Sequence, residues 1–319
     1  MKLKCAILDD YQQVALKMAD WASIEEQVLV HSFSQHFEKE EELIDAIQDC
    51  EIIVIMRERT PFTAALFEKL PKLKLLITSG MRNASIDLAA ASMYGVTVCG
   101  TASSSEPPTE LTWALLLNLA RNVTLENRVL RENGPWQSTV GADLHGRTLG
   151  LLGLGKIGGR MATIAKAFGM DVIAWSQNLT KEATDKLGVR LANSKGELLA
   201  TSDFVSIHLV LSDRTRGIIG RQELEQMKRS AYLINTSRAA IVDQEALIKA
   251  LEENRIAGAG LDVFEEEPLP ANHAYRTLPN VLATPHLGYV SEHNYRAYFT
   301  EAVEDIAAFL EGAAIRKIN

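Results

Sequence analysis

Short apolar runs alternate with amphipathic segments along the first hundred residues. The apolar runs that predict β-strands are Cys5–Leu8, Val28–Phe33, Ile52–Met56, Leu73–Thr78 and Val96–Cys99. The segments between them that have helical periodicity include Glu40–Ile47, Ala64–Leu70 and Ile86–Met93. A repeated strand, helix, strand order is typical of a mostly parallel sheet with helices on both faces. We therefore predict an α/β unit here.

The pattern changes at Pro107 and returns later in the chain. A leucine-rich stretch predicts one long helix over Glu110–Arg131, which ends before an Asn-Gly-Pro sequence at 133–135. The alternation then restarts, with predicted strands at Thr148–Leu152, Asp171–Trp175, Phe204–His208, Ala231–Asn235, Ala257–Asp262 and Val281–Ala283. These strands predict a second α/β unit. A last helical pattern, Ser291–Leu310, is compatible with packing on either unit.

Length and charge narrow the class of protein. The chain has 319 residues, enough for two domains that each bury a core. Its 33 Lys and Arg residues against 41 Asp and Glu residues give a formal net charge of −8, and no long basic run is present. This balance argues against a nucleic-acid partner and against a polybasic membrane patch.

The cysteines and the apolar runs bear on the compartment. Cys5, Cys50 and Cys99 are too few and too scattered for a disulfide framework or a Cys-rich zinc site, so we predict the reducing cytoplasm and no metal. The longest apolar stretch, around Leu111–Ala120, is far shorter than the roughly 20 residues that span a bilayer. We expect neither a signal peptide nor a transmembrane helix.

A glycine-rich loop gives the first chemical indication. The segment Gly153-Leu154-Gly155-Lys156-Ile157-Gly158 directly follows a predicted strand and opens a predicted helix that runs to Phe168. In this context the first glycine permits a tight turn, the second permits close approach of a pyrophosphate, and the third permits close helix–strand packing. The loop therefore predicts a dinucleotide site. As a bare string the motif is also compatible with a structural turn.

The choice between NAD and NADP stays open. The next predicted strand ends at Trp175-Ser176, and Ser176 lies where a carboxylate would select NAD by repelling a 2′-phosphate. The arginine that is usual for NADP is also missing. Lys181 is a candidate for that role, although a lysine at a helix start is equally well explained as a solvated side chain.

Three segments that follow predicted strands of the second unit carry reactive side chains. They contain Arg238, Glu267 and His286. Residues just beyond the carboxyl ends of parallel strands converge on the crevice that holds the cofactor. Arg238 would bind a substrate carboxylate and polarise the C2 oxygen, and His286 would protonate that oxygen as hydride arrives. Glu267 would orient the imidazole and favour its charged form.

Each of these residues also has a purely structural explanation. Arg238 would otherwise cap a helix or pair with Asp243, and Glu267 would be a solvated member of an acidic run. His286 would be a loop histidine bonded to the backbone. Their ordered placement after three strands is what favours hydride transfer to a 2-keto acid.

Taken together, these segments resemble the D-isomer-specific 2-hydroxyacid dehydrogenase family. Leu149–Gly158 resembles its nucleotide signature, Asn235–Asp243 its arginine signature, and Leu261–Pro270 with Thr284–Gly288 its glutamate and histidine segments. The resemblance implies NAD(P)-dependent interconversion of a small 2-keto acid and its D-2-hydroxy acid. It implies Arg238, Glu267 and His286 as catalytic residues. The candidate cofactor-binding residues are Gly153, Gly155, Lys156, Ile157, Gly158, Ser176, His208, Thr236 and Asp262.

The resemblance also implies an architecture. A dinucleotide-binding domain, residues 100–285, would be inserted into a flavodoxin-like substrate-binding domain formed by residues 1–99 and 286–319. Both domains would be Rossmann-like parallel α/β structures. A homodimer would form through residues 110–136, although the leucines there are equally compatible with an ordinary core.

Three departures from the family pattern affect the prediction. Where relatives usually have Gly-x-Gly, this chain has Gly80-Met81-Arg82, and Ala239 replaces a glycine that is commoner after the arginine. Ser176 is the third departure and leaves the cofactor open. We predict that Arg57, Gly80, Met81 and Arg82 bind substrate, with Arg82 either in the cleft or on the surface. The alternative functions are a non-catalytic NAD(H)-sensing, corepressor-like protein and a formate-type dehydrogenase.

Overall fold

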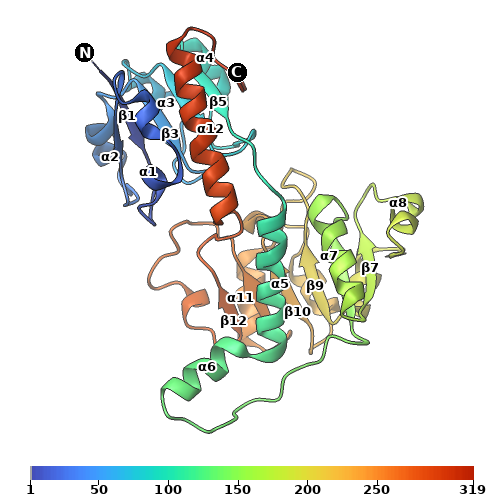
Figure 1. The fold of residues 1–319 in the computed structure, drawn as a ribbon. Helices are drawn as coiled ribbons and strands as arrows, with labels where there is room; N and C mark the ends of the chain where they lie inside the picture. Colours follow the sequence, from blue (N-terminus) through green and yellow to red (C-terminus); the bar gives the residue numbers. More distant parts are fainter. Residues whose placement is uncertain (1) are drawn as a thin grey trace. The chain divides into compact units, whose positions relative to one another are not determined.

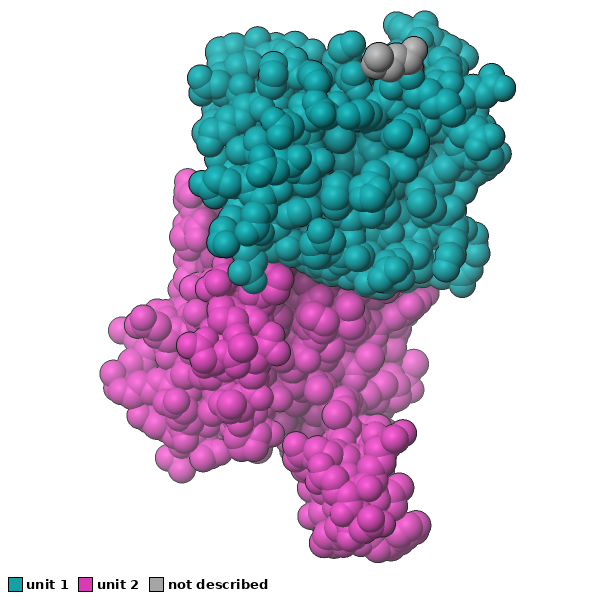
Figure 2. Space-filling view, turned by 90° about the vertical axis from the view of Figure 1, so that its left-hand side faces the viewer, with its two compact units in different colours: residues 1–104, 291–319 teal, residues 105–290 magenta. Residues whose placement is uncertain are grey.

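The structure, a computed structural model, describes residues 2–319 and divides into two compact units (Figure 2). Unit 1 consists of residues 1–104 and 291–319, and unit 2 of residues 105–290. The sequence predicts that the chain passes from one domain to the other near Gly100 and near Pro285. Hydrogen bonds explain the positions found here: the amide of Ser104 donates to Asn294 within unit 1, and the amide of Gly288 donates to Asp262 within unit 2.

Unit 1 is built on a five-stranded parallel sheet with the order β2-β1-β3-β4-β5 (Figure 1). Its strands are β1 (Leu3–Ile7), β2 (Val28–Ser32), β3 (Ile52–Ile55), β4 (Leu75–Thr78) and β5 (Thr97–Gly100). Its helices are α1 (Ala15–Met18), the 3-10 helix η1 (Trp21–Ile24), α2 (Glu40–Ile47), α3 (Ala64–Glu68), α4 (Leu88–Met93) and α12 (Glu292–Leu310). This strand order is that of flavodoxin-like folds.

Every residue of β3 and β4 is buried, because helices cover both faces of this sheet. Ile53 and Ile55 point to one face and pack in a core with Leu43 of α2 and Leu66 of α3. On the unit's other side α12, red in Figure 1, packs against β4, α1 and η1. The C-terminal helix therefore belongs to unit 1.

Unit 2 is built on a seven-stranded parallel sheet with the order β12-β11-β10-β9-β6-β7-β8. Its strands are β6 (Thr148–Leu152), β7 (Asp171–Trp175), β8 (Arg190–Leu191), β9 (Phe204–Ile207), β10 (Tyr232–Asn235), β11 (Gly258–Leu261) and β12 (Val281–Ala283). Its helices are α5 (Glu106–Arg121), α6 (Val123–Arg131), α7 (Lys156–Ala167), α8 (Lys181–Lys186), α9 (Lys195–Thr201), α10 (Arg221–Gln226) and α11 (Gln244–Glu252), with 3-10 helices η2 (Ala239–Ile241) and η3 (Ala274–Arg276).

The unit 2 sheet separates two apolar cores. Leu233 points into a core with Leu247 of α11, and the next residue, Ile234, points into the opposite core with Leu115 of α5. This alternation is what the two-residue period of a strand produces. Counted from β6, the order is that of the doubly wound dinucleotide-binding fold with one further strand at the β12 edge. The predicted fold class is confirmed.

The predicted single helix over Glu110–Arg131 is wrong. The helical chain begins at Glu106, with Pro107 and Pro108 in its first turn, where proline is tolerated. It breaks at Asn122, which has a φ of 53°, and continues as α6. Asparagine is one of the few residues other than glycine that adopts this left-handed conformation. Strand β8 was not predicted, because two residues are too short to form a pattern.

None of the helices in residues 2–319 combines the length and the apolar character that crossing a membrane requires.

Candidate active site

The glycine loop joins β6 to α7, and two of its glycines are required by geometry. Gly153 has a φ of +100°, and a Cβ there would lie 2.5 Å from the carbonyl oxygen of His208. A Cβ on Gly158 would lie 2.2 Å from the carbonyl oxygen of Gly153. A Cβ on Gly155 would instead meet nothing within 4 Å. Gly153 and Gly158 therefore pack tightly against protein backbone, whereas Gly155, where α7 begins, has open space beside it.

This arrangement fits a dinucleotide. The first amides of α7 have no partners within the helix, and the helix dipole favours an anion at that end. Gly155 and Lys156 are exposed at this N-terminus, and Ile157 is half-buried. NAD or NADP would thus be held through its pyrophosphate at the helix start.

Two further candidate cofactor residues lie after the strands on either side of β6. Ser176 is half-buried directly after β7, and Lys181 extends from α8 to bind Asp185 at 2.9 Å. The ion pair between Lys181 and Asp185 gives that lysine a structural explanation. After β9, Nε2 of His208 lies 2.9 Å from Oγ of Ser206, and burial lowers the pKa of His208 to about 4. The His208 ring is therefore neutral at physiological pH.

The loops after β11 and β12 bring Glu267 and His286 together. Nδ1 of His286 lies 2.6 Å from Oε2 of Glu267, and both side chains are largely shielded from solvent. The second oxygen of Glu267 accepts the amide of Phe264 at 2.9 Å, which fixes the carboxylate in its turn. The His286 ring also lies edge-on to Tyr289, with ring centres 5.4 Å apart. Because Nδ1 is occupied by Glu267, Nε2 is the nitrogen left for a reaction.

Asp262 holds the loop that carries this histidine. It is fully buried at the end of β11, and one oxygen accepts from the Thr284 hydroxyl and the Leu287 amide, both at 2.7 Å. The other oxygen accepts the Gly288 amide at 2.8 Å. Burial raises the pKa of Asp262. A cofactor contact of Asp262 stays a prediction, and its contacts here are with the His286 loop.

Arg238 lies after β10, whose neighbour in the sheet is β11. Its loop is braced by Asn235, which donates from Nδ2 to the Arg238 carbonyl at 3.0 Å and accepts the Ser237 amide at 3.1 Å. The Ser237 hydroxyl donates to the Ile207 carbonyl, and the Thr236 hydroxyl lies 2.8 Å from that of Thr112. Arg238, Glu267 and His286 thus follow three adjacent strands.

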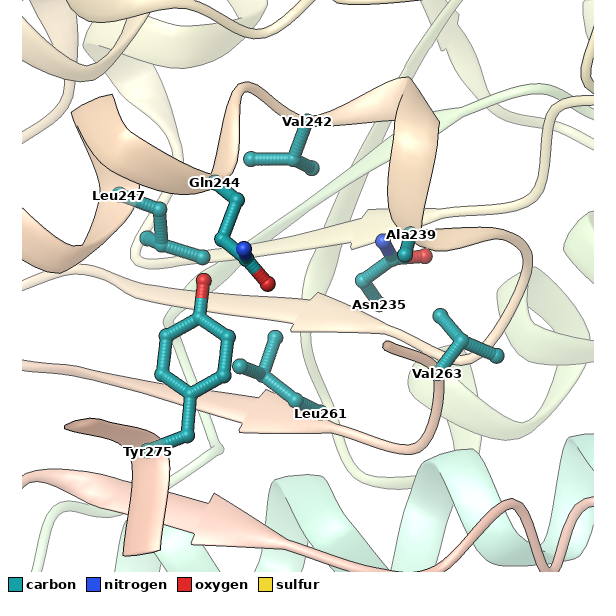
Figure 3. Close-up of a pocket in the computed structure, with 8 residues that line it drawn as sticks. All are labelled: Asn235, Ala239, Val242, Gln244, Leu247, Leu261, Val263 and Tyr275. Carbon is teal, nitrogen blue, oxygen red and sulfur yellow. The ribbon is translucent and has the colours of Figure 1, made fainter. Parts of the chain in front are cut away.

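A small pocket backs the Arg238 loop rather than the glycine loop. Figure 3 shows the Tyr275 hydroxyl and the Gln244 amide facing one space, with Asn235 and Ala239 on its far side. Asp243, the alternative partner considered for Arg238, caps α11 by accepting the Ala246 amide at 3.0 Å.

The predicted substrate-binding residues belong to the loops after β3 and β4 of unit 1. Nη1 of Arg57 donates to the Ser79 carbonyl at 3.1 Å, and this side chain covers Gly80, where a Cβ would lie 2.1 Å from Nη1. Gly80 has a φ of +91°. Met81 and Arg82 are exposed. The structure therefore brings Arg57 and Gly80 together and leaves the other two at the surface of unit 1.

Sequence reasoning missed the side chains that brace these loops. Asn235 and Asn83 each bond the backbone of a loop that carries a candidate arginine: Nδ2 of Asn83 donates to the Arg57 carbonyl at 2.6 Å. An asparagine directly after or near a strand end is the available signal, since its amide suits such turns.

Comparison with known proteins shows which family the chain resembles. Residues 113–288 match the NAD binding domain of the D-isomer specific 2-hydroxyacid dehydrogenases. The chain is 38% identical over 275 residues to a D-3-phosphoglycerate dehydrogenase of Methanocaldococcus jannaschii, covering 85% of this chain but only 52% of that protein. It is 38% identical over 278 residues to a glyoxylate reductase of Korarchaeum cryptofilum, covering 85% of this chain and 82% of that protein.

Solved structures agree as well. A phosphoglycerate oxidoreductase from Vibrio cholerae matches with a TM-score of 0.93 and 38% identity, over 98% of this chain and 100% of that chain. The fold and site define an NAD(P)-dependent oxidoreductase. The chain belongs to the D-isomer specific 2-hydroxyacid dehydrogenase family. The predicted class of reaction, interconversion of 2-keto and 2-hydroxy acids, is confirmed at the level of the family.

Proposed function

We propose that this chain reduces a small 2-keto acid, such as glyoxylate or hydroxypyruvate, to the D-2-hydroxy acid. The observation that carries the proposal is the 2.6 Å contact between His286 and Glu267, which follow the two strands next along the sheet from the strand that precedes Arg238. A carboxylate bonded to one ring nitrogen fixes the tautomer and orientation of the imidazole and stabilises its protonated form. Such a histidine is suited to give and take a proton.

His286 acts as the acid and base. When bound, NADH or NADPH supplies the hydride that arrives at C2 of the keto acid. His286 donates the proton from Nε2 to the C2 oxygen, and Glu267 stabilises the imidazolium before that transfer. In the reverse direction neutral His286 takes the proton back.

Arg238 binds the substrate carboxylate. A guanidinium offers two parallel N–H groups to a carboxylate, which fixes the orientation of the acid as well as adding binding energy. The bonds from Asn235 and Ser237 support this role, because they hold the backbone on both sides of Arg238.

The two units have different roles in this proposal. Unit 2 is the dinucleotide-binding domain, with the glycine loop on the pyrophosphate and Ser176 near the adenosine ribose. Its cofactor contacts also include His208, Thr236 and Asp262. Unit 1 is the substrate-binding domain, and Arg57, Gly80, Met81 and Arg82 are its contacts.

We also infer a homodimer through residues 110–136. In this region Val123 and Leu130 of α6 are 57% and 55% exposed, and Trp136 in the following loop is 83% exposed. Helix α6 buries none of its residues within unit 2. An apolar helix face of this kind supports self-association. The cytoplasm stays our prediction for the compartment, which three free and buried cysteines support.

The test is oxidation of NADH and NADPH by the purified protein, followed at 340 nm with a panel of 2-keto acids. We expect turnover with glyoxylate or hydroxypyruvate. Replacing Arg238 by Ala lowers kcat/KM by roughly 10- to 150-fold while cofactor binding is retained, and His286→Ala abolishes turnover. Dinucleotide binding without turnover of any keto acid would instead favour the sensor, and turnover of formate alone would favour a formate-type enzyme.

A further inference from the structure

Unit 1 contains a buried ionic cluster that the proposed roles leave unexplained. Asp9, in the segment that follows β1, is 1% exposed and has a φ of 58°. Its Oδ1 lies 2.9 Å from Nδ1 of His36, and its Oδ2 accepts the Thr60 hydroxyl at 2.7 Å. Its carbonyl oxygen accepts Nη1 of Arg59 at 3.0 Å. Asp9 therefore joins the segments that follow β1, β2 and β3.

The location of this cluster matters. Strand β1 lies between β2 and β3, so the chain changes direction across the sheet at this point. Open α/β sheets bind ligands beyond the carboxyl ends of the strands at such a switch point. A left-handed aspartate there is uncommon for an L-residue and persists only where surrounding contacts hold it.

The segment 57–60 is held from two sides. At its start, the amide of Arg57 donates to Oγ of Ser79 at 2.8 Å, and the Arg57 carbonyl accepts Nδ2 of Asn83 at 2.6 Å. At its end, Asp9 binds Thr60 and Arg59, and the Arg59 guanidinium lies 4.4 Å from the centre of the Tyr11 ring. Arg57 itself has a φ of 54°, so its position depends on both sets of contacts.

His36 makes one of these contacts sensitive to protonation. The charged groups that face its ring are Asp9, Glu38 and Arg59. The hydrogen bond to Asp9 is the main cause that raises the pKa of His36, against the opposing effects of burial and Arg59. Below that pKa the contact is a charge-assisted hydrogen bond, and above it the neutral ring gives a weaker one.

We propose that Asp9, His36 and Thr60 are positioning residues that hold Arg57 for the substrate, and that loss of the His36 proton loosens this hold. The inference rests on the proposed function, because that function gives Arg57 its substrate-binding role. None of the three residues touches substrate or cofactor in this proposal. The cluster acts only through the segment 57–60.

The experiment compares three variants at His36 and Asp9 over a range of pH. In His36→Ala and Asp9→Asn we expect KM for the keto acid to rise about three- to tenfold below the pKa of His36, with kcat and NADH affinity little changed. In His36→Asn the side-chain amide replaces the Nδ1 donor without titrating. We expect it to keep a KM near that of the wild type at low pH and to remove the rise in KM that the wild type shows as His36 deprotonates.

His31→Asn is the matched control, since His31 lies in β2, is exposed and is outside the cluster. Its KM should follow the wild type at every pH. Hydrogen exchange of a peptide that covers residues 57–62 supplies a readout independent of activity, and it should be faster in His36→Ala than in the control.

Two results overturn the proposal. One is that His36→Ala has the KM of the wild type at every pH. The other is that hydrogen exchange at residues 57–62 is faster in His36→Ala but its KM does not change. Failure of the proposed function is a different outcome, because the wild type itself would then turn over no keto acid. In that case unchanged exchange in His36→Ala would also reject the cluster as the support of this segment.

Discussion

At the scale of single residues, the candidate site consists of reactive side chains that are each fixed by a less obvious neighbour. Glu267 fixes His286, Asn235 fixes the Arg238 loop, and Asp262 fixes the backbone beyond His286. His286 itself has a φ of 52°, a left-handed conformation that is uncommon for residues other than glycine. The orientation of the imidazole is thus set by several contacts together, which is what preorganised catalysis requires.

The charge of Glu267 gives the first prediction. In Glu267→Gln the side chain keeps its shape but no longer stabilises the imidazolium, so protonated His286 is lost at lower pH. We expect keto-acid reduction to fade at a lower pH than in the wild type, and hydroxy-acid oxidation to extend correspondingly to lower pH. The measurement is kcat/KM against pH in both directions.

Glu266→Gln is the control, because it removes the same charge from an exposed neighbouring position. Its two profiles should match those of the wild type. Superimposable profiles for Glu267→Gln and the wild type would remove Glu267 from the mechanism.

Candidate catalytic residues can be picked out from the sequence, whereas the side chains that support them cannot. Arg238 and Glu267 are found because each follows an apolar strand, a local signal. The brace from Asp262 to the amide of Leu287 joins residues 25 positions apart, and the bond from Asp9 to Thr60 spans 51 positions. Such bonds depend on which strands become neighbours, and a single chain's pattern does not contain that information.

At the scale of elements, the turn from β6 to α7 is the least tolerant part of the site. Two of its glycines pack backbone against backbone, so any side chain there displaces main-chain atoms. Ser176, directly after the following strand β7, has no such constraint. In the proposed function, the glycine turn therefore sets where a dinucleotide binds, and Ser176 influences whether that dinucleotide is NAD or NADP.

Ser176 carries the second prediction. Because no carboxylate repels a 2′-phosphate there, NADPH should be used within about tenfold of NADH. Ser176→Asp should raise the preference for NADH at least about tenfold further, by accepting from the ribose hydroxyls and repelling the phosphate. The measurement is kcat/KM for both cofactors, with Ser176→Asn as an uncharged control. A wild type that already prefers NADH a hundredfold would show that another feature excludes NADPH.

The boundaries of elements were predictable where strong start and stop residues lie. Helix α2 and strands β6, β7 and β12 have the predicted limits, because apolar and polar residues change sharply there. The break between α5 and α6 was not predictable. The apolar pattern continues through Asn122, and only the backbone conformation of that residue becomes left-handed. Helical periodicity reports which face is apolar and does not register a one-residue break.

At the scale of the whole molecule, α6 and the loop after it expose apolar side chains that unit 2 does not bury. Figure 1 shows them extending from the end of α5 away from the sheet of unit 2. Their exposed apolar side chains include Val123, Leu130, Trp136 and Val140. In the proposed homodimer, a second copy of the chain covers them.

The corresponding prediction is tested by Leu130→Glu. A buried charge at a dimer interface costs several kcal/mol, so the variant should sediment as a monomer at micromolar concentration where the wild type sediments as a dimer. Leu29→Glu in β2 is the control, because Leu29 is 59% exposed in unit 1 and lies outside the proposed interface. A wild type that is monomeric by sedimentation velocity contradicts the proposal.

The position of α12 has a consequence for the order in which the chain acquires structure during synthesis. Its side chains Tyr298, Phe299 and Ile306 are buried in unit 1, yet residues 105–290 are translated between the sheet of that unit and this helix. At the usual 5–20 residues per second, the ribosome needs about 10–40 s for that interval. Unit 2 is continuous, and all seven of its strands are synthesised within this interval. The apolar face that α12 covers therefore stays exposed until the last segment of the chain has been synthesised. During this interval we expect the nascent chain to be most prone to aggregation and to binding by chaperones.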